Sequence, residues 1–221
     1  VPARTADLDS VPFSSEPVVP FAQLGPDRAF LEMRRGGRES ALVPSKGPVR
    51  ERSVEKLVEL GARLIFSTGY AELGLTTGDL RPHSCFVEVL EGLSDELGTM
   101  RVGLKVDRLG FEYLTSEQAD ALSETGQESV AMYPISGSQR LRELTGAVAE
   151  PEPNTGPERL LAAAQRAGRL GFTQILLNFV IGLPGETEED VRESAGLAVA
   201  LKEAVRAALP SEKRGRLRTV A

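Results

Sequence analysis

Four short stretches of the sequence carry residue types that could do chemistry. The first is MRRGGRESALV at 33–43, which begins at the end of the largely apolar run FLEM at 30–33. Glycines let a backbone pass close to a ligand, and guanidinium groups bind anions, so this stretch could hold a phosphate or a carboxylate. Arg34, Arg35 and Arg38 could equally pair with acidic groups such as Glu51. We favour this second interpretation, a solvated and salt-bridged loop.

The second stretch is His83-Ser84-Cys85. A cysteine beside a histidine could be a nucleophile with its general base. On a helix, however, residues two apart point in nearly opposite directions, so we expect a hydrogen-bonded surface histidine and a buried structural thiol. The chain has one Cys and one His. An intrachain disulfide is therefore excluded, and zinc sites or iron–sulfur clusters built from Cys and His lack ligands.

The remaining two stretches are polar turns that follow predicted strands. In SGSQRLREL at 136–144, Ser136, Ser138 and Gln139 could bond a ribose or a carboxylate, or they could cap the next helix. In IGLPGETEEDV at 181–191, glycines and a helix N-terminus could receive a flat ligand. A well-formed turn between a strand and a helix explains the second motif without a ligand, as capping explains the first.

These stretches need a scaffold, and the apolar pattern supplies one. Strand-like and helix-like segments alternate from residue 28 onward. We expect strands at 29–33, 72–76, 101–106, 129–133, 175–181 and 217–220, and helices beginning after Ser53, at Phe86, at Ser116 (as its own cap), at Pro157 and after Thr187. Gly98 and Gly171 are expected to end two of these helices. The segment 175–181 is almost wholly apolar, which is typical of a strand covered on both faces.

This alternation predicts an α/β fold with a parallel sheet and right-handed crossovers. Five or six strands are too few for a closed eight-stranded barrel, so we expect an open, partial (β/α)6-type parallel barrel. In such folds ligands lie at the carboxyl ends of the strands, which here fall at 33–43, 76–82, 107–111, 133–140 and 182–187.

Composition limits the partners. The net charge of −6 argues against nucleic acid, and no apolar run approaches the length needed to cross a bilayer. Residues 1–27 are rich in Pro, Ser and Asp, so we expect an extended N-terminal arm, followed by the barrel at 28–221. Such an arm is ordered only where a surface holds it. The first residue is Val, which is compatible with a removed targeting peptide or with a fragment boundary.

Taken together, these segments resemble the radical S-adenosylmethionine (SAM) superfamily. The resemblance is to a bacterial and plastid-type group in which the radical SAM domain lies between a cobalamin-binding-like region and a small C-terminal domain. It rests on EPVVPFAQLGPDRAFLEMRRG from Glu16, PVRERSVEKLVEL (48–60), TGYAELGL with TTGD (68–79), LKVDRL (104–109), GSQRLREL (137–144) and VIGLPGETEEDV (180–191). It implies SAM-side contacts at Ser138, Gln139, Gly182, Leu183, Pro184 and Gly185.

The sequence departs from this family where its chemistry resides. The family binds an iron–sulfur cluster through a C-x3-C-x2-C pattern in its first loop, and those positions fall here at Gly36, Ser40 and Val43. None of these residues supplies a thiolate. Ile135 stands where the family pattern has an acidic residue. The resemblance therefore implies neither a metal nor another cofactor for this chain.

We expect a non-catalytic relative, not an enzyme, that serves as a structural or interaction subunit of a larger complex. Its partners would be other protein subunits, in a complex that can be membrane-attached, with no nucleic acid and no transmembrane segment of its own. The family resemblance favours a plastid or another organelle; the other location considered is the cytoplasm. Two alternatives stay open: a SAM- or nucleotide-binding module, and a radical SAM enzyme whose cluster ligands come from a partner chain.

Overall fold

The computed structural model describes residues 7–13, 28–37, 47–145 and 156–220. They form two compact units, which we describe one at a time. The first contains the described residues of 1–37 together with 47–109 and 115–127, and the second contains 110–114 and the described residues from 128 onward. Residues 1–6 and 14–27 lie outside the described ranges, so the extended arm over 1–27 stays a prediction.

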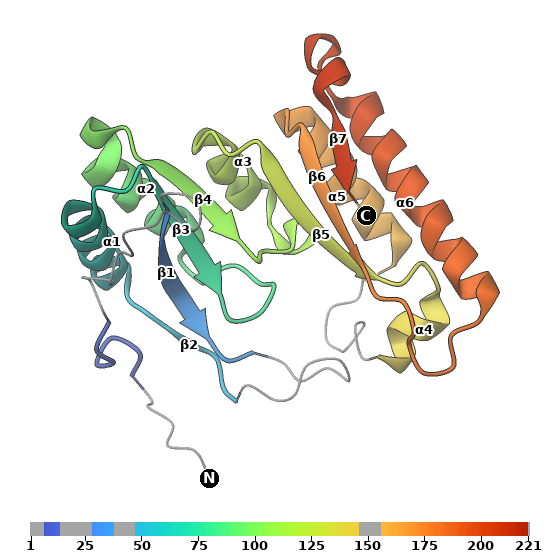
Figure 1. Cartoon of the computed structure of the whole chain (residues 1–221), viewed down its shortest axis with the longest axis horizontal. Helices are drawn as coiled ribbons and strands as arrows, with labels where there is room; N and C mark the ends of the chain where they lie inside the picture. Colours follow the sequence, from blue (N-terminus) through green and yellow to red (C-terminus); the bar gives the residue numbers. More distant parts are fainter. Residues whose placement is uncertain (1–6, 14–27, 38–46, 146–155, 221) are drawn as a thin grey trace, which may run out of the picture. The chain divides into compact units, whose positions relative to one another are not determined.

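The first unit is a four-stranded sheet with helices (Figure 1). Its strand order is β2-β1-β3-β4, in which β1, β3 and β4 run parallel and the short β2 lies antiparallel to β1. The strands are β1 (Arg28–Arg35), β2 (Arg50–Glu51), β3 (Glu72–Thr77) and β4 (Gly103–Asp107). The helices are α1 (Val54–Thr68), α2 (Phe86–Leu97), the 3-10 helix η1 (Gly98–Met100) and α3 (Ser116–Glu124).

The core of this unit lies between α1, α2 and the sheet. A Cβ placed on Gly61 of α1 would lie 2.6 Å from the Leu93 side chain of α2 and 3.0 Å from Leu73 of β3. Helix and strand therefore approach as closely as glycine allows. Leu31 and Leu57 are fully buried in the same core.

The helix ends confirm two predicted end residues, Ser53 and Gly98, and correct a third. The Ser53 side chain accepts a hydrogen bond from Lys56 N and caps α1, as predicted. For α3 the cap is Thr115, one residue earlier than predicted, because Thr115 and Gln118 form a reciprocal capping box. Gly98 ends α2 as predicted, but in a right-handed conformation, since the chain tightens there into η1.

The second unit is a three-stranded parallel sheet in the order β5-β6-β7 (Figure 1). The strands are β5 (Ser129–Ile135), β6 (Gln174–Phe179) and β7 (Arg218–Val220). The helices are η2 (Phe111–Tyr113), α4 (Gln139–Leu144), α5 (Pro157–Leu170), α6 (Glu188–Ala208) and η3 (Ser211–Arg216). Helices α5 and α6 pack tightly at Gly168, where an added Cβ would lie only 2.5 Å from the Val205 carbonyl oxygen.

Apart from the short antiparallel β2, both units consist of parallel strands with helices between them, and in the described residues neither sheet closes on itself. The predicted α/β class and the open, partial parallel barrel are therefore confirmed. The surroundings predicted for 175–181 are wrong. In β6, Ile175 and Leu177 are buried, but Leu176 between them is 44% exposed, so this apolar strand is covered on one face and open on the other.

A buried carboxyl holds η2 to the edge of β5. Glu112 Oε1 accepts the amide hydrogen of Tyr133 at 2.9 Å, and its Oε2 is buried with no partner among the described residues. The Arg159 side chain donates to the Glu112 carbonyl oxygen at 2.9 Å. Burial raises the pKa of Glu112 to about 7, although the hydrogen bonds from the backbone and the charge of Arg159 act in the opposite direction.

This carboxyl should make stability depend on pH. Between pH 4.5, its ordinary pKa, and about pH 7, the folded chain keeps a proton that the unfolded chain loses. The free energy of unfolding therefore falls as pH rises through this window, by up to about 3 kcal/mol. We expect Glu112→Gln to remove this fall and to be more stable than wild type at pH 8, as measured by urea unfolding at a series of pH values. Parallel pH profiles for the two proteins would contradict the prediction.

Candidate functional site

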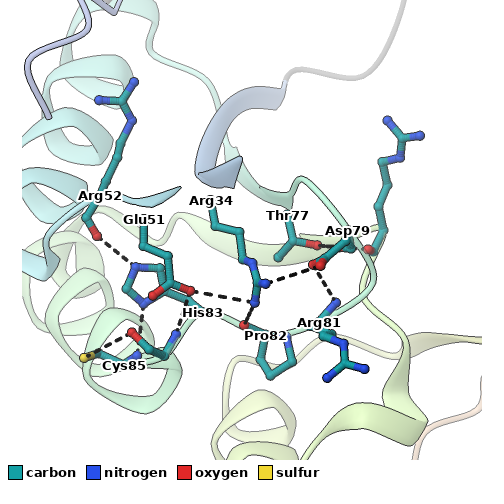
Figure 2. A network of polar contacts seen from close by, with 11 residues as sticks. Arg34, Glu51, Arg52, Thr77, Asp79, Arg81, Pro82, His83 and Cys85 are labelled. Atoms are coloured by element: carbon teal, nitrogen blue, oxygen red, sulfur yellow. Dashed lines mark hydrogen bonds and ion pairs between the residues drawn. The ribbon is translucent and has the colours of Figure 1, made fainter. Parts of the chain in front are cut away.

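A buried arginine organises the carboxyl end of β1 (Figure 2). Arg34 lies opposite Glu51 of β2 and Thr77 of β3, and it is 7% exposed. Its Nη1 donates to the Pro82 carbonyl oxygen at 2.6 Å and lies 3.7 Å from Glu51 Oε1. Its Nη2 donates to Asp79 Oδ2 at 3.3 Å. One cation thus joins two strands and the turn that follows β3.

That turn lies directly against the end of β1. A Cβ on Gly78 would lie 2.9 Å from Arg35 Cα and 3.0 Å from the Gly36 carbonyl oxygen, so only glycine fits without a shift. The Thr77 hydroxyl donates to the Asp79 and Arg108 carbonyl oxygens. Asp79 Oδ1 also accepts the Arg81 amide hydrogen at 3.2 Å, which fixes the carboxylate that Arg34 meets.

His83 and Cys85 reverse the burial that the sequence suggested. His83 is buried, at 3% exposed, and Cys85 is partly exposed. The Cys85 amide donates to His83 Nδ1 at 3.0 Å, so Nδ1 is an acceptor and the proton lies on Nε2, which donates to the Arg52 carbonyl oxygen at 2.8 Å. Both ring nitrogens are therefore bound to backbone groups, and neither serves as a base for the thiol.

The predicted arginine interactions are found in part. Arg34 pairs with Glu51 and Asp79, but it is buried rather than solvated. Arg35 forms an exposed pair with Glu32 at 2.6 Å. Arg38 lies outside the described residues. Two carboxylates match the charge of Arg34, so this network holds the backbone of β1, β2 and the turn after β3 in place.

The start of the loop after β1 leaves no room for a metal-binding side chain. Gly36 has φ +90°, and a Cβ there would lie 2.1 Å from the Pro48 carbonyl oxygen. A Cβ on Gly37 would lie 2.5 Å from Asp79 Oδ2. Neither position could carry a cysteine in this conformation, and the one cysteine of the chain, Cys85, lies directly before α2. Ser40 and Val43, the other two positions of the family pattern, lie outside the described residues.

The serines after β5 face the protein rather than open space. Ser136 Oγ accepts the Ser138 amide hydrogen at 3.1 Å and lies 3.4 Å from Ser194 Oγ. The Gly137 amide donates to the same Ser194 hydroxyl at 2.8 Å, and a Cβ on Gly137 would meet the α6 backbone at 2.3 Å. Ser138 is the N-terminal cap residue of α4, but its side chain does not cap that helix.

The Ser138 side chain instead bonds Asp190, which ties α4 to α6. Asp190 Oδ2 accepts from Arg140 Nη2 at 2.6 Å and from the Thr187 amide at 2.8 Å. Hydrogen bonds from Ser138 and Thr187, with a further one from Arg140, hold the pKa of Asp190 well below its usual range. The cap predicted for α6 at Thr187 is confirmed, as a capping box with Asp190. Gln139 points elsewhere and donates to Glu143 at 2.8 Å.

The turn between β6 and α6 satisfies its own polar groups. The Gly182 amide donates to Glu186 Oε2 at 2.5 Å, and the Leu183 carbonyl oxygen accepts the Glu186 amide hydrogen at 2.9 Å. The Gly185 carbonyl oxygen accepts from Arg140 at 3.0 Å. Arg140 bonds both Gly185 and Asp190, and Asp190 in turn bonds Ser138, so Gly185 and Ser138 are linked through these two side chains. Pro184 is exposed. That these residues bind SAM stays a prediction.

Sequence reasoning missed Arg142 and Asp190. Arg142 is 3% exposed, and its Nη1 donates to the carbonyl oxygens of Ser136 and Gly137 at 2.7 and 2.9 Å. Its Nε and Nη2 are buried without partners in the described part of the chain, and burial lowers its pKa. The four-residue spacing of Asp190 and Ser194 could have revealed a shared helix face. Nothing in the local sequence marks Arg142 as buried.

The described residues contain neither a cluster of metal-binding side chains nor a helix suited to a membrane. We found no group of three His, Cys, Asp or Glu side chains that could hold a metal ion there. None of the helices in these ranges is both long and apolar enough to cross a membrane.

The Arg34 network should contribute strongly to stability. We expect Arg34→Met to lower the free energy of unfolding by about 2–4 kcal/mol, because it leaves Glu51 and Asp79 without their cation in a largely buried setting. Arg35→Met is the matched control, since its pair with Glu32 is half-exposed and should contribute less than about 0.5 kcal/mol. Urea unfolding followed by far-UV circular dichroism measures both. Equal losses in the two variants would overturn this assignment.

Ile135 stores backbone strain at the end of β5. It has φ +66°, a left-handed conformation that β-branched residues rarely adopt, and its carbonyl oxygen accepts the Val180 amide hydrogen at 2.8 Å. Asparagine tolerates this conformation, so Ile135→Asn should raise the free energy of unfolding by about 1 kcal/mol. Ile181→Asn, at a 75% exposed isoleucine just beyond β6, should change it little. Thermal unfolding of both variants tests this, and a destabilised Ile135→Asn protein would refute it.

Comparison with known proteins assigns the sequence to a family. The sequence model described as the Radical SAM superfamily matches residues 32–198, more than half of the chain. No functionally curated protein matches the chain at a significant level.

Solved structures give the same result for the fold. The radical SAM methyltransferase TsrM from Kitasatospora setae, with tryptophan and a SAM analogue bound, has a TM-score of 0.66 and 16% identity over 79% of this chain. OxsB, a cobalamin-dependent SAM radical enzyme with aqua-cobalamin and SAM bound, has a TM-score of 0.56 and 13% identity over 76% of this chain. HydG, a maturase of FeFe-hydrogenase, has a TM-score of 0.53 and 15% identity over 80% of this chain.

The matched region spans 34% of the TsrM chain, 26% of OxsB and 40% of HydG. At these identities the structures establish a shared fold alone. The family assignment rests on the sequence model, whose match includes the loop after β1, the turn at Gly182–Gly185 and most of α6. The chain belongs to the radical SAM superfamily.

Proposed function

We propose that this chain is a non-catalytic radical SAM barrel that serves as a structural or interaction subunit of a larger protein complex. One observation carries the proposal: the loop after β1 contains no cysteine, and its first residues, Gly36 and Gly37, have no room for any side chain. In the family pattern, this loop supplies the three thiolates that bind the iron–sulfur cluster.

The available donors do not fit that cluster. Cysteine thiolates bind such clusters, and this chain has a single cysteine, next to α2 rather than in the loop. Arg34 places a permanent cation at the base of the same loop, held by Glu51 and Asp79. We therefore assign no reaction step to a cluster in this chain.

The SAM-side turns support the same proposal. The Gly182 amide is bound to Glu186, the Ser138 side chain to Asp190, and the Ser136 hydroxyl to the Ser138 amide. Polar groups that already have internal partners gain little from a ligand, because binding only exchanges one hydrogen bond for another. Ile135 adds an apolar side chain where the family pattern has an acid.

Exposed apolar side chains support an interaction role. Leu176 of β6 and Val220 of β7 lie opposite each other in the strand register, so both point to the same face of the sheet, and they are 44% and 61% exposed. A neighbouring protein could cover such a face. The partners in this proposal are protein subunits. The plastid or another organelle as their location rests on the family resemblance.

Anaerobic purification of the native protein tests the proposal. We expect no stoichiometric iron or sulfide, no heat on titration with SAM, and protein partners that co-migrate with the chain and can be identified by mass spectrometry. A solitary 23.7 kDa species would overturn the interaction role.

The two alternatives give different results in the same experiment. SAM binding without iron would favour a SAM-binding module. Stoichiometric iron and sulfide together with a cysteine-donating partner would favour an enzyme whose cluster ligands come from a second chain. Glu186→Gln, which weakens the acceptor of the Gly182 amide, is a useful companion, since it should raise SAM affinity only if the turn is a true binding site.

A further inference from the structure

A short N-terminal segment is held against the first unit. Residues 7–13 lie beside α1 (Figure 1), and Leu8 is 1% exposed. The Leu8 carbonyl oxygen accepts from Arg52 Nη1 at 2.7 Å. The segment belongs to no helix or strand. Its position therefore depends on side-chain contacts and on this hydrogen bond rather than on a sheet ladder.

Asp9 binds the N-terminus of α1. Both of its carboxylate oxygens lie 3.1 Å from the amide nitrogen of Ser53, the residue that caps this 15-residue helix. The N-terminus of a helix carries partial positive charge and free N–H groups, so it attracts a carboxylate. This is an occupied anion site, and the anion comes from the chain itself.

Arg52 forms the second half of the same site. It is 2% exposed, and its guanidinium carbon lies 5.5 Å from the centroid of the Phe13 ring, within range of a cation–π contact. Its Nε is buried and has no partner in the ranges that the structure describes. Figure 2 shows the Arg52 guanidinium pointing away from the Arg34 network, while its carbonyl oxygen meets His83. His83 thus fixes the backbone from which Arg52 reaches the segment.

We propose that Arg52 and the N-terminus of α1 form a docking site for a linear peptide with the pattern Leu-Asp-x3-Phe. The chain's own residues Leu8, Asp9 and Phe13 fill this site in cis, and the segment is separable from it. A peptide of the same pattern supplied in trans competes for the site. This inference concerns a different surface from the cluster loop and holds whether or not the chain is catalytic.

The contacts predict a weak and specific peptide site. One buried aliphatic side chain, one charge-assisted hydrogen bond and one cation–π contact give a dissociation constant on the order of 0.1–1 mM for a free peptide. The tethered segment has an effective concentration on the order of millimolar, which suffices to keep it docked. A competing peptide should therefore be detectable once the tethered segment is weakened.

The test uses the full chain and a fluorescein-labelled peptide, TADLDSVPFSS, that spans residues 5–15. In fluorescence anisotropy we expect saturable binding to the Leu8→Ala/Asp9→Ala double variant, and binding about two- to tenfold weaker to wild type, whose own segment occupies the site. A peptide with Asp9→Asn should lose about tenfold in affinity. A peptide with Ser10→Ala is the matched control, because the Ser10 hydroxyl donates within the segment, to the Asp7 carbonyl oxygen.

A second measurement keeps the proposal falsifiable if the double variant does not fold. In Asp9→Asn alone, the Ser53 amide should exchange its hydrogen faster than in wild type, and excess wild-type peptide should slow it again. Equal peptide affinity for wild type and the folded double variant would overturn the proposal, as would no binding to either. An Asn-containing peptide that binds as well as the Asp-containing one would also overturn it.

Discussion

The first unit depends on one buried cation. The Arg34 guanidinium lies between Glu51 and Asp79 and also donates to Pro82, so β1, β2 and the turn after β3 share a single charged group. A buried charge is stable only with partners in place, which means that each of these segments is required by the others. The glycines at 36, 37 and 78 follow from this arrangement, because the backbone of three segments meets there without space for side chains.

The second unit uses a carboxylate in the same way. Asp190 receives hydrogen bonds from Thr187, Arg140 and Ser138, and it thereby joins the first turn of α6 to α4. In both units, a charged side chain near the carboxyl ends of the strands therefore holds neighbouring segments together.

β2 and the residue that follows it, Arg52, connect the Arg34 network to the N-terminal segment. Successive residues of an extended chain point to opposite sides, so Glu51 reaches the Arg34 network while Arg52 reaches the N-terminal segment. His83 joins them, since its Nε2 donates to the Arg52 carbonyl oxygen, and Glu51 accepts from the amide of the neighbouring Ser84. The docked segment and the end of β1 are therefore both held by side chains from one short stretch, residues 51–52.

The sequence by itself determined the order of the parallel strands and the main helices, the caps at Ser53 and Thr187, the end of α5 at Gly171 and the family, but not the short β2. These features follow from local patterns, because a cap or an apolar repeat acts on backbone within a few residues. Tertiary structure alone decided that Arg34, His83 and Arg142 are buried, that Leu176 is exposed and that Ile135 is left-handed. Arg34 and Ile135 have partners far away in the chain, as Asp79 is from Arg34, 45 residues on, whereas Arg142 bonds to Ser136 and Gly137 nearby. Burial and pairing are set by packing between distant segments, which no local pattern encodes.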